Sequence, residues 1–351
     1  MVRQEPGTDD RSALRKKEHL TISLDYDPGS SPVTTGLENY AFIHQSLPEI
    51  DFNSIDLSTT LLDLPLSAPI IVSPMVGGIE AAAGINRCLA EAAQTLGLAM
   101  GVGSQRCMIE EPETAYTYQV RQAAPDIPLF ANLGAVQLNY GYGIDECRRA
   151  VESIQANALV LHLNPFQEVF QPEGNTNFSG LLEKIAGICH NLPVPVIVKE
   201  VGFGISGEIA ARLAGAGVSG IDVAGSGGTS WSRIEALRNG RRKSRLAATF
   251  STWGIPTAEC LRMVRERVTD VCLIASGGIK TGLDIAKTIA LGADAAGIAL
   301  PLLKPGTLST DAVIAALEEV IEGLKIAMFC TGSAVIADLK NTSHLVKREK
   351  G

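Results

Sequence analysis

Several features that define other classes of protein are missing from this chain of 351 residues. Its seven cysteines form no CxxC pair and are spread thinly along the sequence, which favours a reducing compartment. No stretch approaches the roughly 18 consecutive apolar residues of a membrane span, and the N-terminus lacks the apolar core of a secretory signal. We therefore expect a soluble, cytoplasmic protein with no membrane partner.

Charged residues are also few, at 19% of the chain, whereas hydrophobic residues make up 46%. This composition supports a substantial core and excludes disorder for most of the chain. The net charge of −8 argues against a general affinity for nucleic acid or anionic lipid. An anionic ligand would have to be bound by a local site.

The composition divides the chain into four segments. Residues 1 to about 13 are polar and mixed in charge, and we expect them to be disordered. Residues 14–68 are expected to form an N-terminal extension that wraps the main domain and contributes a lid. Residues 69–339 are expected to be that domain with its C-terminal helices, and residues 340–351 a flexible tail.

Eight short apolar runs recur through the main domain, and helical patterns separate most of them. Nearly continuous apolar runs are typical of parallel strands that are buried on both faces. The predicted strands cover residues 69–75, 98–104, 128–133, 158–164, 195–201, 220–225, 271–278 and 295–300. This repetition predicts an α/β protein with a (β/α)8 TIM barrel, and a doubly wound sheet is the alternative.

Polar residues gather at the ends of these runs, where core packing does not require them. The residues concerned are Ser104, Gln105, Arg106, Asn132, His162, Asn164, Lys199, Glu200, Gly277 and Gly278. Barrel enzymes take their catalytic groups from the C-terminal ends of the strands. The sequence therefore predicts an active site at that end of the barrel.

Two glycine-rich segments follow the sixth and seventh predicted strands, GSGGTSW at 225–231 and SGGIKTG at 276–282. Glycines allow backbone N–H groups to approach an anion, and Thr229 adds a hydroxyl donor. Phosphate sites near the last strands recur in barrels. Two tight turns are the alternative, but the position on neighbouring strands favours a phosphate site.

Lys199 ends an apolar strand, where an unpaired ammonium is costly, so it needs an anionic or electron-rich partner such as a bound cofactor. A pair with Glu200 is disfavoured because adjacent strand residues point to opposite faces. Asn132 has a donor and an acceptor, which suits the edge of a ring with alternating N and O groups. A satisfied core amide is an equally good interpretation of Asn132 alone.

The segment HLNPFQE at 162–168 places polar side chains just beyond the fourth predicted strand. Glu168 can hold a hard cation through oxygen, Gln167 can hydrogen-bond a ligand, and His162 can donate to phosphate. An isolated histidine is more often a packed, hydrogen-bonded imidazole, but these neighbours favour a functional one.

Two basic clusters stand out in this acidic chain. Arg15, Lys16, Lys17 and His19 form the first, for which a solvated charge run is the alternative. The second, NGRRKSR at 239–245, is expected to lie in a loop between the sixth and seventh strands without a functional role.

Together these motifs resemble those of the type 2 isopentenyl-diphosphate isomerases, a flavin-dependent family. RKKEHL, MVGG, GVGSQR, HLNPFQE, VIVKEVGFGIS, DVAGSGGTSW, WGIPT and ASGGI occur in the family's order between residue 15 and about 335. The resemblance implies interconversion of isopentenyl diphosphate and dimethylallyl diphosphate in isoprenoid biosynthesis. It also implies bound FMN that is reduced at the expense of NADPH, a requirement for Mg2+, and a homotetramer or homo-octamer.

The resemblance also implies a set of site residues. For FMN these are Met75, Val76, Ser104, Asn132, Lys199, Thr229, Gly277, Gly278, Ala299 and Leu300. For the substrate they are Arg15, Lys16, Ser104, Gln105, Arg106, His162 and Gln167. Glu168 is the implied Mg2+ ligand, and Gln167, His162 and Lys199 are the implied catalytic residues. The family usually has threonine at the position of Val76, so hydrogen bonding near the flavin differs here.

The implied reaction moves a double bond without net redox change, so it requires an acid able to protonate an unactivated alkene. Few of the side chains are acidic enough, whereas reduced flavin can give and take protons at N5. In this scheme Lys199 stabilises the negative N1/O2 edge of the flavin.

Two other functions are compatible with a flavin barrel. The first is an FMN oxidoreductase of the 2-hydroxy-acid oxidase or dihydroorotate dehydrogenase type. Such oxidases need a histidine base near an arginine after the seventh strand, and no histidine lies between residues 190 and 344. The second is a catalytically silent flavin-binding barrel, against which the intact cluster around Gln167 and Glu168 argues.

Overall fold

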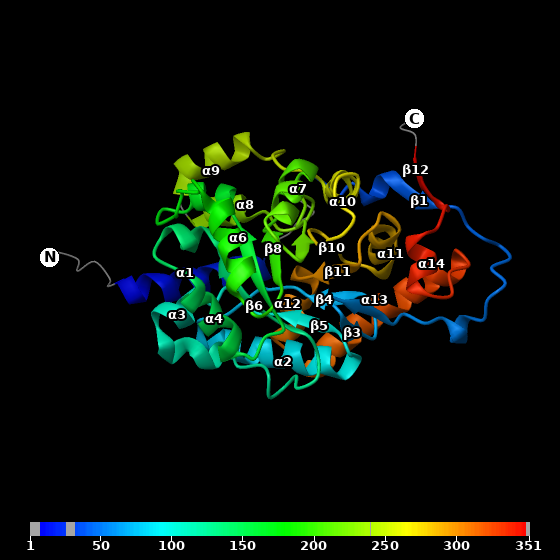
Figure 1. The fold of residues 1–351 in the computed structure, drawn as a ribbon, viewed down its shortest axis with the longest axis horizontal. Coiled ribbons are helices and arrows are strands. Elements are labelled where there is room, and N and C mark those ends of the chain that lie inside the picture. The colour runs from blue at the N-terminus through cyan, green and yellow to red at the C-terminus, as the bar shows by residue number, and fades with distance from the viewer. Residues whose placement is uncertain (1–7, 26–31, 239, 349–351) are drawn as a thin grey trace.

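Eight parallel strands close into a barrel at the centre of the computed structural model, which describes residues 8–25, 32–238 and 240–348 (Figure 1). They are β4 (Ile70–Val72), β5 (Ala99–Gly101), β6 (Leu129–Gly134), β7 (Ala158–Leu163), β8 (Val196–Glu200), β9 (Gly220–Asp222), β10 (Cys272–Ala275) and β11 (Ala295–Ile298). They pair in chain order, and β11 pairs with β4 to close the ring. Each strand overlaps one predicted run, so the (β/α)8 prediction is confirmed and the doubly wound sheet is excluded.

Helices connect the strands and surround the barrel. They are α2 (Glu80–Leu96), α3 (Arg106–Glu110), η4 (Pro112–Tyr118), η5 (Ala135–Asn139), α4 (Ile144–Ser153), α5 (Pro165–Phe170), α6 (Leu181–Asn191), α7 (Gly207–Gly215), α8 (Trp231–Arg238), α9 (Gly240–Thr249), α10 (Thr257–Arg265), α11 (Gly282–Ala290), α12 (Leu300–Gly306), α13 (Thr310–Cys330) and α14 (Ile336–Lys340). The basic segment 239–245 was expected to be a loop, but α9 begins at Gly240 and covers most of it.

The predicted helix between the first two strands shows how the sequence sets these elements. Ile85 and Leu89 of α2 are buried against the barrel, one helical turn apart. Gly97 ends the helix with a φ of 63°, and a Cβ there would lie 2.2 Å from the Ser67 hydroxyl oxygen. Only glycine fits this turn.

The N-terminal extension divides into parts with different positions. Its helix α1 (Thr8–Leu24) contacts α8 and α12, and the hairpin of β2 (Thr59–Leu61) and β3 (Leu64–Leu66) packs against the barrel interior. Between them lie η2 (Leu37–Asn39), β1 (Tyr40–Phe42) and η3 (Phe52–Ser54). The extension therefore reaches both ends of the barrel.

Both predicted flexible ends contain regular structure. The disordered start was expected to extend to about residue 13, but α1 begins at Thr8; residues 1–7 lie outside the described residues. The expected flexible tail contains β12 (Leu345–Lys347), which pairs antiparallel with β1. A short tail becomes ordered here because β1 offers it backbone partners.

No helix in the described ranges combines the length and the apolarity needed to cross a membrane.

Candidate active site

A layer of polar side chains lies at the C-terminal end of the barrel interior. Ile71, Phe130, Val160, Ile197 and Ile274 belong to the apolar cluster inside the barrel. Two residues after each of them come Ser73, Asn132, His162, Lys199 and Ser276, and Asp222 stands two residues after Gly220. Because strand side chains alternate with a period of two, these six polar side chains also point inward. We call them the polar floor.

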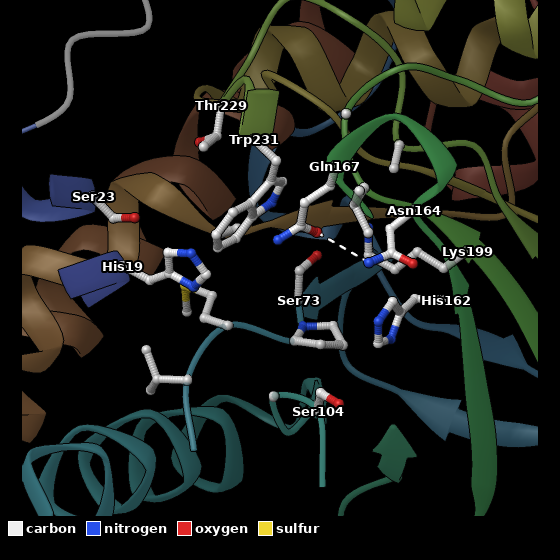
Figure 2. Close-up of a pocket in the computed structure, with 18 of the residues that line it drawn as sticks. His19, Ser23, Ser73, Ser104, His162, Asn164, Gln167, Lys199, Thr229 and Trp231 are labelled. Carbon is white, nitrogen blue, oxygen red and sulfur yellow. Dashed lines mark hydrogen bonds between the residues drawn. The ribbon is translucent and has the colours of Figure 1, made fainter. Parts of the chain in front are cut away.

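Five side chains of the polar floor, all except Asp222, line a cavity of about 480 Å3, a size typical of small-molecule sites. Figure 2 shows His162, Lys199 and Ser73 on the barrel side of this cavity, Trp231 and Gln167 opposite them, and His19 approaching from α1. The predicted residues that line it are Arg15, Lys16, Met75, Val76, Ser104, Arg106, Asn132, His162, Gln167, Glu168, Lys199, Thr229, Gly277, Gly278, Ala299 and Leu300.

Gln105 is the exception: it does not line the cavity, and its role in substrate binding stays a prediction. Its side chain is fully buried and points away from the cavity. Its amide donates to the Ala150 carbonyl (2.9 Å) and the Ser153 hydroxyl (3.0 Å), and its Oε1 accepts from the Asn132 N–H (2.9 Å). Gln105 thus anchors the backbone that presents Asn132.

Lys199 has the anionic partner that its position requires. Its Nζ lies 3.8 Å from Asp222 Oδ2 on the neighbouring strand, and Asp222 Oδ1 accepts from the Ser276 hydroxyl at 2.6 Å. The ammonium also donates to the Glu200 carbonyl at 2.7 Å. This chain of contacts holds the lysine at one place on the polar floor.

The Glu200 side chain turns away from Lys199, as strand alternation predicts. Its Oε2 accepts from the N–H groups of Val201, Gly202 and Phe203 at 2.7, 2.8 and 2.5 Å. Burial raises the pKa of Glu200 to about 7, although these N–H groups oppose the shift. Glu200 therefore organises the loop after β8.

His162 is held next to Asn132, with its Nδ1 2.8 Å from Asn132 Oδ1. Burial, with a contribution from Lys199, lowers the pKa of His162 to about 4, so the ring is neutral near pH 7. A neutral ring that donates from Nδ1 has an acceptor at Nε2. His162 would therefore have to gain a proton before it could donate to phosphate through Nε2.

One face of α1 lines the cavity through Arg15, Lys16, His19, Leu20 and Ser23, which follow helical spacing. The basic cluster is therefore not simply a solvated charge run.

A hydrogen bond from His19 and an ion pair from Glu18 hold this helix against α8. His19 Nε2 lies 2.7 Å from Glu235 Oε1, and Arg238 contacts Glu18 at 2.9 Å and Glu235 at 2.6 Å. Burial lowers the pKa of His19, and Glu235 opposes the shift. Burial would raise the pKa of Glu235, but His19 and Arg238 bring it below its usual value.

Glu168 has part of the environment that Mg2+ prefers. Its carboxylate is buried and accepts from Asn164 Nδ2 (2.7 Å) and the Asn175 N–H (2.5 Å). Asn164 Oδ1 is buried with no hydrogen-bond partner among the described residues, and an unpaired buried oxygen is costly. Across the part of the chain that the structure describes, no cluster of three or more His, Cys, Asp or Glu side chains is suited to a metal. This oxygen set fits an ion that keeps waters and substrate phosphates as its other ligands.

The two glycine loops touch each other as well as the cavity. Gly277 has a φ of 97°, and a Cβ there would lie 2.1 Å from the Gly225 carbonyl oxygen. A Cβ at Gly228 would lie 2.5 Å from the Gly278 nitrogen. The glycines are thus needed for the close approach of the two loops, and Gly228, Gly277 and Gly278 also present backbone to the cavity.

Several site residues were not identified from the sequence. Asp222 and Ser276 complete the polar floor, and counting two residues on from each inward apolar residue would have found them. Trp231 and Glu235 both lie on α8, and Trp231 is its first residue. The Trp231 ring contacts the His19 ring edge-on, with 5.1 Å between the ring centroids. No local pattern distinguishes Glu235 from a surface acid.

A family model and curated relatives both match this chain over more than half of its length. The family model for FMN-dependent dehydrogenases matches residues 153–347. An isopentenyl-diphosphate delta-isomerase of Nostoc sp. is 51% identical over 97% of this chain and 98% of its own length. The isopentenyl-diphosphate delta-isomerase of Rickettsia prowazekii is 48% identical over 93% of this chain and 95% of its own length.

Solved structures similar to this chain share its fold. A lactate oxidase of Pediococcus acidilactici superposes with a TM-score of 0.65 at 20% identity, covering 95% of this chain and 87% of that one. A mandelate oxidase superposes with a TM-score of 0.66 at 19% identity, covering 97% of this chain and 98% of that one. At this identity the likeness concerns the barrel and not the reaction.

Proposed function

Because the chain belongs to the isopentenyl-diphosphate delta-isomerase family, we propose that it interconverts isopentenyl diphosphate and dimethylallyl diphosphate with FMN as cofactor. The cavity carries this proposal. Its polar floor suits a heteroaromatic ring, its glycine loops suit a phosphate, and the basic face of α1 suits a second anion.

The residues around the floor fit a flavin. Asn132 and Lys199 would face the ring, as would Met75, Val76 and Ser104. Thr229, Gly277, Gly278, Ala299 and Leu300 would surround the phosphate end. When bound and reduced, FMN supplies the acid and base that an unactivated alkene requires and that the nearby side chains do not offer.

The protein's own side chains bind and orient the substrate. Arg15, Lys16 and Arg106 would bind the diphosphate at the rim, together with Ser104 and a protonated His162. Gln167, held by Asn164 at 3.2 Å and Glu235 at 3.5 Å, would lie beside the allylic carbons. Trp231 and helix α1, acting as a lid, would keep water from the reacting carbons.

Glu168 would hold Mg2+ together with the substrate phosphates, and the unpaired oxygen of Asn164 supports a cation or donor nearby. We also propose NADPH as the reductant of FMN, a homotetramer or homo-octamer, and a cytoplasmic location; the motif resemblance supports these three.

The oxidase alternative lacks its base. The residues after β10 are Ser276, Gly277 and Gly278, where such an enzyme needs a histidine.

The test is to incubate purified protein with FMN, NADPH, Mg2+ and isopentenyl diphosphate and to measure dimethylallyl diphosphate. We expect product with far less than one equivalent of NADPH consumed, solvent deuterium in the product made in D2O, and activation by photoreduction alone. Stoichiometric NADPH oxidation would favour an oxidoreductase. Full activity with redox-inert flavin would assign the acid to a side chain.

A further inference from the structure

The ammonium of Lys16 is held by a tyrosine that does not itself reach the cavity. Lys16 Nζ donates to the Tyr118 hydroxyl at 2.7 Å and to the Ser104 carbonyl at 3.2 Å. The same hydroxyl donates to the Ser104 carbonyl at 2.7 Å. Lys16 and Ser104 line the cavity, whereas Tyr118 is fully buried behind them.

The Tyr118 ring has little freedom to move. A Cβ at Gly77 would lie 2.0 Å from its Cε1 atom, so the ring packs directly against the backbone of the loop after β4. The preceding residue, Thr117, accepts from the Gly78 N–H through its hydroxyl and from Asn86 Nδ2 through its carbonyl, both at 2.8 Å. Tyr118 thus has a fixed position relative to one wall of the cavity.

The direction of these hydrogen bonds is set by chemistry. An ammonium can only donate, so the phenol oxygen accepts from Lys16 and gives its single proton to the Ser104 carbonyl. Burial raises the pKa of Tyr118 well above its usual value, which keeps that proton in place. Burial lowers the pKa of Lys16, and the nearby Cys107 side chain opposes the shift. A buried ammonium depends strongly on each acceptor that it retains.

We propose that Tyr118 is a positioning residue for substrate binding, which acts through Lys16 to fix one positive charge where the diphosphate binds. The inference rests on the proposed function, because it takes Lys16 to be a diphosphate contact. A lysine has a flexible stem and loses rotamer entropy when its head is fixed. The contact with Tyr118 fixes it before substrate arrives, which lowers the cost of binding.

The test compares Tyr118→Phe in the wild-type and Lys16→Ala backgrounds of the FMN-loaded protein. Phenylalanine keeps the ring against Gly77 and removes only the hydroxyl. We expect KM for isopentenyl diphosphate to rise about three- to tenfold with kcat changed less than about twofold. The Kd of inorganic pyrophosphate, measured by calorimetry with Mg2+, should rise by the same factor. In the Lys16→Ala background, Tyr118→Phe should have no further effect on either quantity.

Tyr140→Phe is the matched control. It removes a hydroxyl that accepts from the Asn177 N–H at 3.1 Å, outside the cavity, and should change neither quantity. Gly77→Ala is an independent variant because it displaces the Tyr118 ring without touching its hydroxyl, and its effect on Kd should also vanish in the Lys16→Ala background.

Equal effects of Tyr118→Phe in both backgrounds, or a lower kcat with unchanged KM and Kd, would overturn the proposal and leave Tyr118 a structural residue. The proposed function fails separately, if the wild-type protein makes no dimethylallyl diphosphate. The pyrophosphate measurements do not depend on turnover, so they test Tyr118 in either case.

Discussion

The two ends of the barrel use arginine in different ways. At the end opposite the cavity, Arg265 donates to the carbonyls of Gly292 (2.6 Å) and Val271 (3.1 Å) and to the Asp294 carboxylate (2.5 Å). Arg121 likewise donates to the Ala124 and Ile127 carbonyls at 2.9 and 3.0 Å. Both guanidinium groups join backbone segments that lead into strands.

At the cavity end the arginines contact carboxylate side chains, two of them on a different segment of the chain and one on the same helix. Arg238 of α8 contacts Glu18 of α1, Arg15 lies 3.7 Å from Glu173, and Arg106 lies 2.8 Å from Glu110. Backbone carbonyls cannot leave an arginine without unfolding the loop, whereas a carboxylate can give way to another anion. The comparison indicates that the arginine contacts at one end maintain the fold, whereas those at the other end leave room for an anionic ligand to replace a carboxylate.

The largest loss of activity should follow Glu168→Ala, at the cavity end of the barrel. We expect activity to fall by about 100-fold or more, because the diphosphate loses the cation that offsets its charge. The absorbance of bound FMN should persist, since Glu168 is not assigned to the flavin. Glu168→Gln is the matched variant that keeps volume and one oxygen. Unaltered dependence on Mg2+ concentration in both variants would remove Glu168 from the metal site.

Arg15→Ala and Lys16→Ala should weaken substrate binding by about 10- to 150-fold each, because each removes a charged hydrogen bond to phosphate. The affinity for FMN should barely change. Lys17→Ala is the control, since Lys17 is exposed on the other face of α1. A KM for isopentenyl diphosphate that stays at the wild-type value in both variants would mean that this face of α1 does not bind substrate.

Arg265→Ala should change stability and leave kcat/KM unchanged. It removes the side-chain donor to several carbonyls and one of the donors to Asp294, so we expect a loss of about 2–4 kcal/mol in the free energy of unfolding. Arg262→Ala, on the same helix, breaks only exposed ion pairs and should cost less than about 1 kcal/mol. Denaturant unfolding measures the free energy of unfolding of both variants, and steady-state kinetics measures their kcat/KM. A lower kcat/KM in Arg265→Ala would contradict the view that this end of the barrel only maintains the fold.

The smallest effect concerns pH. The pKa of His162 is lowered from 6.5 to about 4, so between these values the unfolded chain binds a proton that the folded chain excludes. His162 therefore costs stability progressively as the pH falls from about 6.5 towards 4. Glu200, with its raised pKa, acts in the opposite sense, so the wild-type curve is not diagnostic alone. The difference in unfolding free energy between wild type and His162→Gln should shrink on acidification from pH 7.5 to 5; a constant difference would contradict the assignment.

The barrel could be predicted because its strands leave a strong local signal. Buried parallel strands are apolar along most of their length, so each short apolar run marked one. The ends of the strands were found by the same logic, and most of the predicted residues line one cavity. Gln105 does not line the cavity because a polar residue after a strand can turn to either side, and here its amide donates to Ala150 and Ser153 of α4.

The remaining errors come from contacts between distant parts of the chain. Glu235 was overlooked because α1 reaches it from more than 200 residues away. The tail was expected to be flexible because β12 has no apolar pattern of its own, and only pairing with β1 orders it. Such pairings are properties of the fold and leave little trace in local composition.

The β2–β3 hairpin has a kinetic consequence. Leu61 and Leu66 pack against the apolar interior of the barrel below the polar floor, so the hairpin closes that end of the barrel. A ligand on the floor would have to arrive and depart on the side of α1, where the proposed diphosphate contacts lie. A cofactor on the floor would therefore bind before the diphosphate and leave after it. Such a cofactor would remain bound through many turnovers while substrate and product exchange above it.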